Sequence, residues 1–121
     1  MSAQPQVLAV DDDEDIRAMI EMALDLGGIS STGAASGEGA LQRLREGLRP
    51  SVILLDLMMP GLSGWDFRAA QACDLELAAI PVVVLSGGGN VAKEAESLGA
   101  RAYLRKPVDL DDLLQTVRRY L

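Results

Sequence analysis

Short apolar runs alternate along the chain with segments in which apolar residues recur at helical spacing. In runs such as Val7–Val10 every residue is apolar, and apolar and polar residues do not alternate. This pattern is typical of strands buried on both faces of a parallel sheet. Elsewhere Ile16, Ile20 and Leu24 repeat at every fourth position, which predicts the buried face of a helix. The alternation therefore predicts a series of strand–helix units.

The pattern predicts five strands and five helices. Strands are expected at 7–10, 30–35, 52–55, 81–85 and 102–104, and the small residues of the second favour a position at the sheet edge. Helices are expected before Gly27, between Ser36 and Gly47, at 64–73, at 91–98 behind Asn90, and after Asp109. The first helix is expected to bury Met19, and the last to bury Leu110, Leu113, Leu114, Val117 and Leu121.

This order of elements predicts a doubly wound α/β fold. Right-handed crossovers between parallel strands place helices on both faces of the sheet. The strand order 2-1-3-4-5 fits five such units, so we expect a flavodoxin-like three-layer (βα)5 sandwich that forms a single domain over residues 1–121. Strands one and three are then neighbours, and ligands bind beyond the carboxyl ends of the strands where the strand order reverses.

Composition and charge exclude several classes of protein. Of the 121 residues, 49% are hydrophobic and 24% are charged, which is ordinary for a globular domain and argues against disorder. The net charge is −7 and the 11 basic residues are scattered, so we expect no binding of nucleic acid by this domain. The absence of histidine excludes histidine-based acid–base or nucleophilic catalysis.

The same composition favours a cytoplasmic protein. Cys73 is the single cysteine, so no internal disulfide can form and a reducing compartment is the simplest interpretation. No apolar run approaches the roughly 20 residues that span a bilayer. The short polar segment before Val7 also lacks the features of a secretory signal. We expect a soluble, cytoplasmic domain without a membrane partner, either stand-alone or part of a longer protein.

Polar residues follow four of the predicted strands at their carboxyl ends, which the order 2-1-3-4-5 brings to one edge of the sheet. Carboxylates held together repel each other, and a divalent cation relieves that cost. Oxygen ligands in a shallow, hydrated site favour Mg²⁺. At this edge we expect three carboxylates, one hydroxyl and one ammonium group around a shallow cleft, contributed by Asp11, Asp12, Asp56, Ser86 and Lys106.

Such a cluster suits phosphoryl transfer. A metal ion and Lys106 would spread the charge of the phosphoryl oxygens while Asp56 attacks phosphorus in line. Ser86 would then hydrogen-bond a phosphoryl oxygen. Taken singly, each residue has a simpler explanation, because acidic residues after a strand often cap the next helix and serine and lysine are common in turns and on surfaces. We assign Asp13 to helix capping, whereas the coincidence of four strand ends favours a functional role for the others.

Several short motifs occur in a fixed order, each after the expected strand. They are Val10-Asp11-Asp12, Leu55-Asp56 with Met59-Pro60 and Gly64, then Ser86, and finally Lys106-Pro107. With these motifs the chain resembles the receiver domain of bacterial response regulators over essentially its whole length. The resemblance implies a phosphorylation-dependent switch of two-component signalling that is not an enzyme proper. It also implies Mg²⁺-dependent self-phosphorylation from a phosphodonor, and self-dephosphorylation.

The resemblance implies a role for each residue of the cluster. Asp56 would accept a phosphoryl group from a histidine kinase, a histidine phosphotransfer protein or a small donor such as acetyl phosphate. Asp12 would bind Mg²⁺ directly and Asp11 largely through water, and Asp56 and the backbone carbonyl of Met58 would complete the ligand set. Lys106 would pair with the phosphoryl group.

A switch pair is also implied by the resemblance. The Ser86 hydroxyl would move toward the phosphate and the Tyr103 ring would turn inward behind it. The face formed by the helix at 91–98, the strand at 102–104 and the last helix would then change its affinity for a downstream effector. Homodimerisation linked to phosphorylation is a further form of output that the resemblance allows.

Two other functions stay open at this point. A binding module that signals without phosphate would keep the fold, and its main support is the irregular loop Gly87-Gly88-Gly89. A phosphatase of the haloacid dehalogenase type would place a general acid two residues after Asp56, where Met58 stands. Absence of Mg²⁺ binding would favour the first alternative, and hydrolysis of a model phosphate ester would favour the second.

Overall fold

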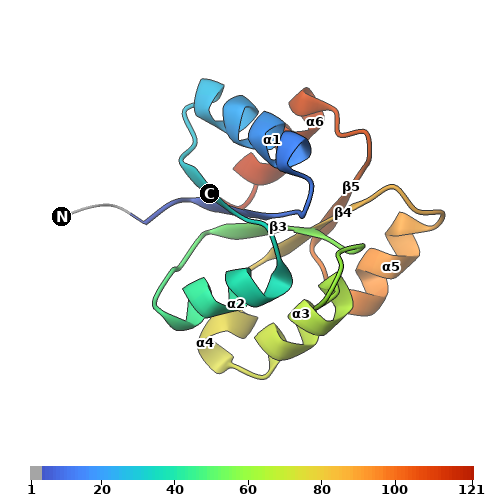
Figure 1. Cartoon of the computed structure of the whole chain (residues 1–121). Coiled ribbons are helices and arrows are strands. Elements are labelled where there is room, and N and C mark those ends of the chain that lie inside the picture. Colours follow the sequence, from blue (N-terminus) through green and yellow to red (C-terminus); the bar gives the residue numbers. More distant parts are fainter. Residues whose placement is uncertain (1–3) are drawn as a thin grey trace.

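The computed structural model describes residues 4–121 and confirms the predicted sheet. Its five parallel strands lie in the order β2-β1-β3-β4-β5, so β2 is at an edge as expected and β1 and β3 are neighbours. Helices cover both faces (Figure 1). The elements are β1 (Val7–Val10), α1 (Glu14–Leu26), β2 (Ser31–Ala34), α2 (Gly37–Arg45), β3 (Val52–Asp56), α3 (Gly64–Ala72), α4 (Leu75–Ala78), β4 (Val82–Ser86), α5 (Val91–Leu98), β5 (Ala102–Arg105) and α6 (Leu110–Arg118).

Two hydrophobic cores hold the three layers together. Helices α1 and α6 cover one face of the sheet, and α2, α3, α4 and α5 cover the other (Figure 1). Along β3, Val52 and Leu54 belong to the core under α1 and α6, whereas Ile53 and Leu55 belong to the opposite core. Because both faces are covered, the strand is apolar at every position from Val52 to Leu55, and this is the pattern that predicts it from the sequence.

The prediction of five helices was wrong, because a short sixth helix, α4, precedes β4. The Asp74 carboxylate accepts a hydrogen bond from the backbone N–H of Glu76 at its start, and Leu77 is buried in the core. The buried Gln71 amide donates to the carbonyl oxygens of Leu77 at 2.8 Å and Ile80 at 3.0 Å. A single turn held in this way is too short to show a helical period in the sequence.

Three residues predicted to be buried are exposed. Met19 exposes 43% of its surface, Leu110 40% and Leu121 46%. A helix turns by about 100° per residue, so a side chain next to the buried face can lie at its margin, as Met19 does beside the fully buried Ile20. Leu121 lies beyond Arg118, where α6 ends.

The predicted helices begin at the residues that the sequence indicates, whereas α6 ends at Arg118, before the predicted Leu121. The side chains of Asp13, Ser36, Asn90 and Asp109 accept backbone N–H groups at the starts of α1, α2, α5 and α6, respectively. Gly99 follows α5 in the left-handed conformation with φ 72°, which favours glycine. Local capping thus sets where these four helices begin and where α5 ends.

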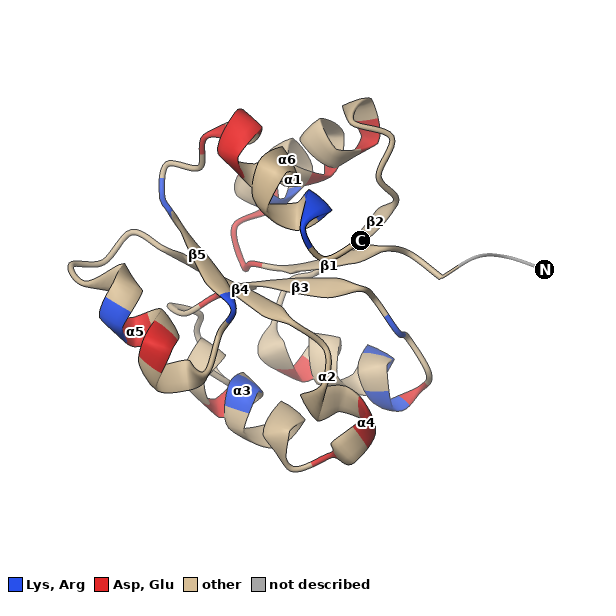
Figure 2. Cartoon of the chain, turned by 180° about the vertical axis from the view of Figure 1, so that it is seen from behind, with Lys and Arg blue, Asp and Glu red and all other residues tan. Residues whose placement is uncertain are grey.

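Charged residues of both signs are distributed over many elements. Figure 2 shows basic segments on α2, α3 and α5, and Arg17 in α1 and Arg118 in α6 lie on the opposite side of the sheet, in agreement with the scatter of basic residues in the sequence. In the part of the chain that the structure describes, no helix has the length and apolar character needed to cross a membrane.

Candidate functional site

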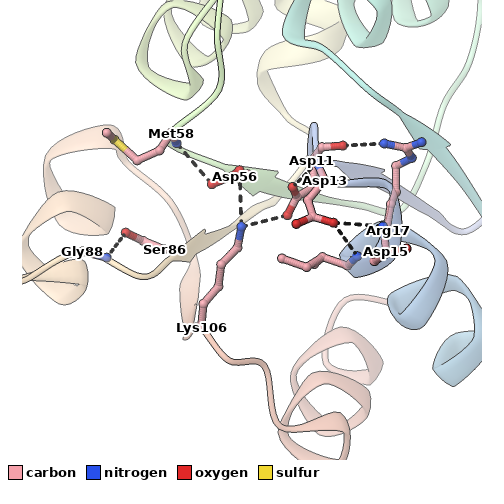
Figure 3. A network of polar contacts seen from close by, with 10 residues as sticks. Asp11, Asp13, Asp15, Arg17, Asp56, Met58, Ser86, Gly88 and Lys106 are labelled. Atoms are coloured by element: carbon pink, nitrogen blue, oxygen red, sulfur yellow. Dashed lines mark hydrogen bonds and ion pairs between the residues drawn. The ribbon is translucent and has the colours of Figure 1, made fainter.

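The ends of β1, β3 and β5 bring two carboxylates and an ammonium group together. Val10 is paired with Leu55 in the sheet, so the residues that follow them, Asp11 and Asp56, leave adjacent strands at the same edge. Lys106 follows β5, and its Nζ lies 2.9 Å from Asp11 Oδ2 and 3.3 Å from Asp56 Oδ2. Figure 3 shows the ammonium group between the two carboxylates. Three of the five predicted side chains therefore form one ionic cluster.

Asp56 is buried, with 3% of its surface exposed. Burial raises the pKa of its carboxyl group above the ordinary value because desolvation disfavours the charged form, and the Asp11 charge acts in the same direction. Two contacts lower this pKa without cancelling the effect of burial. The backbone N–H of Met58 donates to Oδ1 at 3.1 Å, and the Lys106 ammonium approaches Oδ2. The Asp56 carboxylate is therefore oriented by fixed donors.

Lys106 keeps its positive charge although its side chain is only 20% exposed. Burial by itself lowers the pKa of the ammonium group, but the contacts with Asp11 and Asp56 outweigh burial and leave this pKa raised. The backbone N–H of Lys106 also donates to the Ser86 carbonyl at 3.0 Å, which ties the residue to the end of β4. The peptide bond between Lys106 and Pro107 is cis.

Asp11 is fully buried and held on several sides. Its Oδ1 accepts the backbone N–H of Asp13 at 2.9 Å, while the Asp13 carboxylate caps α1 by accepting from Asp15 at 2.9 Å and Ile16 at 3.1 Å. Asp13 is thus a capping residue, as predicted. The Oδ2 atom of Asp11 accepts no well-oriented hydrogen bond among the described residues and relies on the ion pair with Lys106.

This cluster has the donor atoms that a hard divalent cation requires. Carboxylate oxygens of Asp11, Asp12 and Asp56 lie within 4.8 Å of one another, and Asp12 is exposed to solvent. All three ligands are oxygen atoms, and a buried carboxylate oxygen without a hydrogen bond is a position that a cation would satisfy. The residues present therefore fit Mg²⁺, which prefers oxygen ligands and retains part of its water shell.

The two residues expected to act as a switch pair lie on the neighbouring strands β4 and β5. Ser86 is 1% exposed, and its hydroxyl oxygen accepts the backbone N–H of Gly88 at 3.1 Å. Figure 3 shows this hydroxyl turned toward Gly88 rather than toward Asp56. Tyr103 lies on β5 and exposes 46% of its surface, so its ring is turned outward in this structure.

One residue of the site surroundings was missed by sequence reasoning. The guanidinium group of Arg17 in α1 donates to the backbone carbonyl of Asp11 at 2.8 Å, as Figure 3 also shows. This bond links the first turns of α1 to the end of β1, next to the carboxylate cluster. An arginine on a helix that begins at a strand end is a weak signal, because its long side chain can reach many carbonyl groups.

Comparison with known proteins identifies the family to which the chain belongs. The model of the "Response regulator receiver domain" matches residues 7–118. The transcriptional regulatory protein PrrA of Mycobacterium tuberculosis is 39% identical over 120 residues, covering 97% of this chain and 50% of that protein. The C4-dicarboxylate transport transcriptional regulatory protein DctD of Rhizobium meliloti is 33% identical over 122 residues, covering 98% of this chain and 26% of that protein. The chain thus spans about a quarter to a half of these curated relatives.

Solved structures agree with this match in both fold and sequence. The Vibrio cholerae chemotaxis protein CheY4 superposes with a TM-score of 0.87 and 32% identity, covering 98% of this chain and all of that one. A response regulator receiver protein from Pseudomonas putida gives 0.87 and 35% identity, with 98% and 99% covered. The sheet order, the acidic cluster and the match over 7–118 agree, and the chain belongs to the response regulator receiver domains of two-component signal transduction.

Proposed function

We propose that this receiver domain accepts a phosphoryl group on Asp56 from a histidine kinase or a histidine phosphotransfer protein, with Mg²⁺ as cofactor. The single observation that carries the proposal is the Lys106 ammonium group, 3.3 Å from Asp56 Oδ2 and 2.9 Å from Asp11 Oδ2. An ammonium group fixed beside an acceptor carboxylate is the electrostatic arrangement that a transferred phosphoryl group needs.

In the proposed step an oxygen of the Asp56 carboxylate attacks phosphorus. A new P–O bond forms while the P–N bond of the donor phosphohistidine breaks, and its electron pair stays on the imidazole nitrogen. The product is an acyl phosphate on Asp56, and acetyl phosphate would react in the same way with acetate as leaving group. Attack requires the ionised carboxylate, which the Met58 N–H and Lys106 favour against the effect of burial on the Asp56 pKa.

Lys106 would stay paired with the phosphoryl oxygens after transfer. Its ammonium group already bridges Asp11 and Asp56, so a small adjustment of a flexible side chain would bring it to the new charge. Mg²⁺ held by Asp11, Asp12, Asp56 and the backbone carbonyl of Met58 would supply charge neutralisation at the phosphoryl oxygens.

The output would pass through Ser86 and Tyr103. In its contact with Gly88 the Ser86 hydroxyl oxygen accepts, so the hydroxyl proton can be donated elsewhere. A charged phosphoryl oxygen is a strong acceptor, and the Ser86 hydroxyl would move toward the phosphate and donate to it. The exposed Tyr103 ring would turn inward behind it. Both changes alter the face formed by α5, β5 and α6, which would regulate a downstream effector or support a homodimer linked to phosphorylation. Here α5 is the helix expected at 91–98, the fourth of the five helices expected from the sequence.

Phosphorylation by acetyl phosphate tests this function. The chain with Mg²⁺ should gain the mass of one phosphoryl group, and beryllofluoride should change the fluorescence of Trp65, which lies in the first turn of α3. Asp56→Asn keeps the shape of the side chain and should abolish both responses. Phosphorylation of the Asn variant to the same extent, or no phosphorylation of the wild type, would refute the proposal.

A further inference from the structure

Helix α2 holds the loop that follows Asp56 through a carboxylate outside the ionic cluster. Glu38 lies in the first turn of α2, and its Oε1 accepts the backbone N–H of Leu62 at 2.7 Å. The same carboxylate packs against Gly61, which has φ 76°, since a Cβ atom added there would lie 3.2 Å from Glu38 Oε2. The tip of the loop is therefore bound to a helix that begins far earlier in the chain.

The first turn of α2 fits closely onto this loop. A Cβ atom added to the buried Gly37 would lie only 3.0 Å from the carbonyl oxygen of Leu62. Such a distance is tighter than ordinary van der Waals contact, so a side chain at position 37 would push the helix and the loop apart by a few tenths of an ångström. The hydrogen bond between the Leu62 N–H and Glu38 is thus accompanied by close packing of Gly37 against the Leu62 carbonyl group.

The other end of the loop is closed on the strand itself. The backbone N–H of Gly64 donates to the Leu57 carbonyl at 3.2 Å. A Cβ atom on Gly64 would lie 2.7 Å from Leu57 Cα and 2.8 Å from the Asp56 carbonyl oxygen. The segment 57–63 is therefore fixed at its base by Gly64 and at its tip by Glu38. Between these two points lies Met58, whose backbone N–H binds Asp56 Oδ1 at 3.1 Å.

We propose that Glu38 is a positioning residue for the phosphoacceptor site, acting through the Leu62 N–H. It touches neither Asp56 nor the other acidic ligands; it keeps the loop in the conformation that aims the Met58 N–H at Asp56 and the Met58 carbonyl at the cation site. A hydrogen bond to an ionised carboxylate is stronger than one between neutral groups, which suits a contact made at an exposed loop. The role in phosphorylation rests on the proposed function, whereas the role in loop order does not.

Two substitutions separate the hydrogen bond from the charge. Glu38→Ala removes the acceptor and the charge, whereas Glu38→Gln removes the charge and keeps an amide oxygen that can accept from Leu62. Glu96→Ala, on the exposed face of α5, is the control for loss of one negative charge. Three quantities are measured well below the melting temperature: Mg²⁺ affinity from Trp65 fluorescence, the rate of phosphorylation by acetyl phosphate, and hydrogen exchange of the Met58 amide.

Glu38→Ala is expected to weaken Mg²⁺ binding and slow phosphorylation by about fivefold, the factor that corresponds to the loss of one hydrogen bond. Exchange of the Met58 amide should accelerate, and Glu96→Ala should stay close to wild type. Glu38→Gln should lie between wild type and Glu38→Ala, because its neutral amide oxygen still accepts from Leu62 but makes a weaker bond than the carboxylate. Wild-type Mg²⁺ affinity and Met58 exchange in Glu38→Ala would overturn the inference, as would equal impairment in Glu38→Gln. Failure of the wild type to accept phosphate would instead refute the proposed function, and the Mg²⁺ and exchange data would still test Glu38.

Discussion

Replacement of Lys106 by methionine is expected to destabilise the folded domain when Mg²⁺ is absent. The substitution removes the ammonium group that lies 2.9 Å from Asp11 Oδ2 and 3.3 Å from Asp56 Oδ2, and keeps most of the side-chain volume. Two buried carboxylates are then left facing each other. Removing one partner of a buried ion pair costs about 3–5 kcal/mol. Because the Lys106 side chain is still 20% exposed, we expect about 3 kcal/mol, at the lower end of that range.

Urea unfolding at pH 7 measures this loss, with Lys93→Met on the exposed face of α5 as the matched control. The pKa of Lys106 is raised in the folded state, so its ion pairs contribute stability that is fully present below the ordinary lysine pKa of 10.5. That stability disappears as the pH rises through the higher folded pKa. The difference between wild type and Lys106→Met should therefore shrink at strongly alkaline pH.

The double variant Lys106→Met/Asp56→Asn gives an internal check. Neutralising Asp56 removes one of the two opposed charges, so part of the lost free energy of unfolding should return. Added Mg²⁺ should stabilise Lys106→Met more than it stabilises the wild type, because the metal replaces the missing positive charge. A loss in Lys106→Met no larger than in Lys93→Met would refute the claim that this ammonium group holds the cluster together.

Three further predictions concern Asp56, the buried Gln71 beside α4, and the close packing of Gly64. Asp56→Asn should raise the free energy of unfolding at pH 7 without Mg²⁺, because the pKa of Asp56 is raised in the folded state and its charged form therefore costs stability. This gain should vanish as the pH falls toward the ordinary aspartate pKa of 3.8. A variant less stable than the wild type at pH 7 would contradict the prediction. Gln71→Leu removes the buried amide that donates to the carbonyl oxygens of Leu77 and Ile80, and it should cost about 2 kcal/mol in urea unfolding, unlike the exposed Gln115→Leu. Gly64→Ala places a Cβ against backbone atoms and should cost about 2 kcal/mol and slow phosphorylation. Gly89→Ala, where a Cβ meets nothing within 4 Å, is its control, and equal stability of the two variants would count against the close packing.

Much of the fold follows from local patterns in the sequence. Strands covered on both faces are apolar at every position, and the strand 52–55 shows this directly. Helix starts depend on a side chain and the backbone N–H groups two or three residues later, so capping at Asp13 or Ser36 can be predicted from neighbours alone. The strand order then brings the residues after β1, β3 and β5 to one edge, which is why Asp11, Asp56 and Lys106 could be predicted to meet.

What the sequence could not determine depends on contacts between distant segments. The helix α4 exists where Gln71 supplies donors to two carbonyl groups, and a one-turn helix has no period to reveal it. The exposure of Met19 depends on how far neighbouring elements reach across α1, and that of Leu121 on the end of α6 at Arg118.

The sequence by itself determined the order of the elements and the chemistry at the strand ends, because both depend on residues close together in the chain. Only the tertiary structure decided which atoms meet: Lys106 lies nearer to Asp11 than to Asp56, and Glu38 binds the N–H of Leu62, 24 residues away. Periodicity assigns a side chain to a face of the sheet or helix. The distance between two side chains on different elements is set by packing across the whole domain.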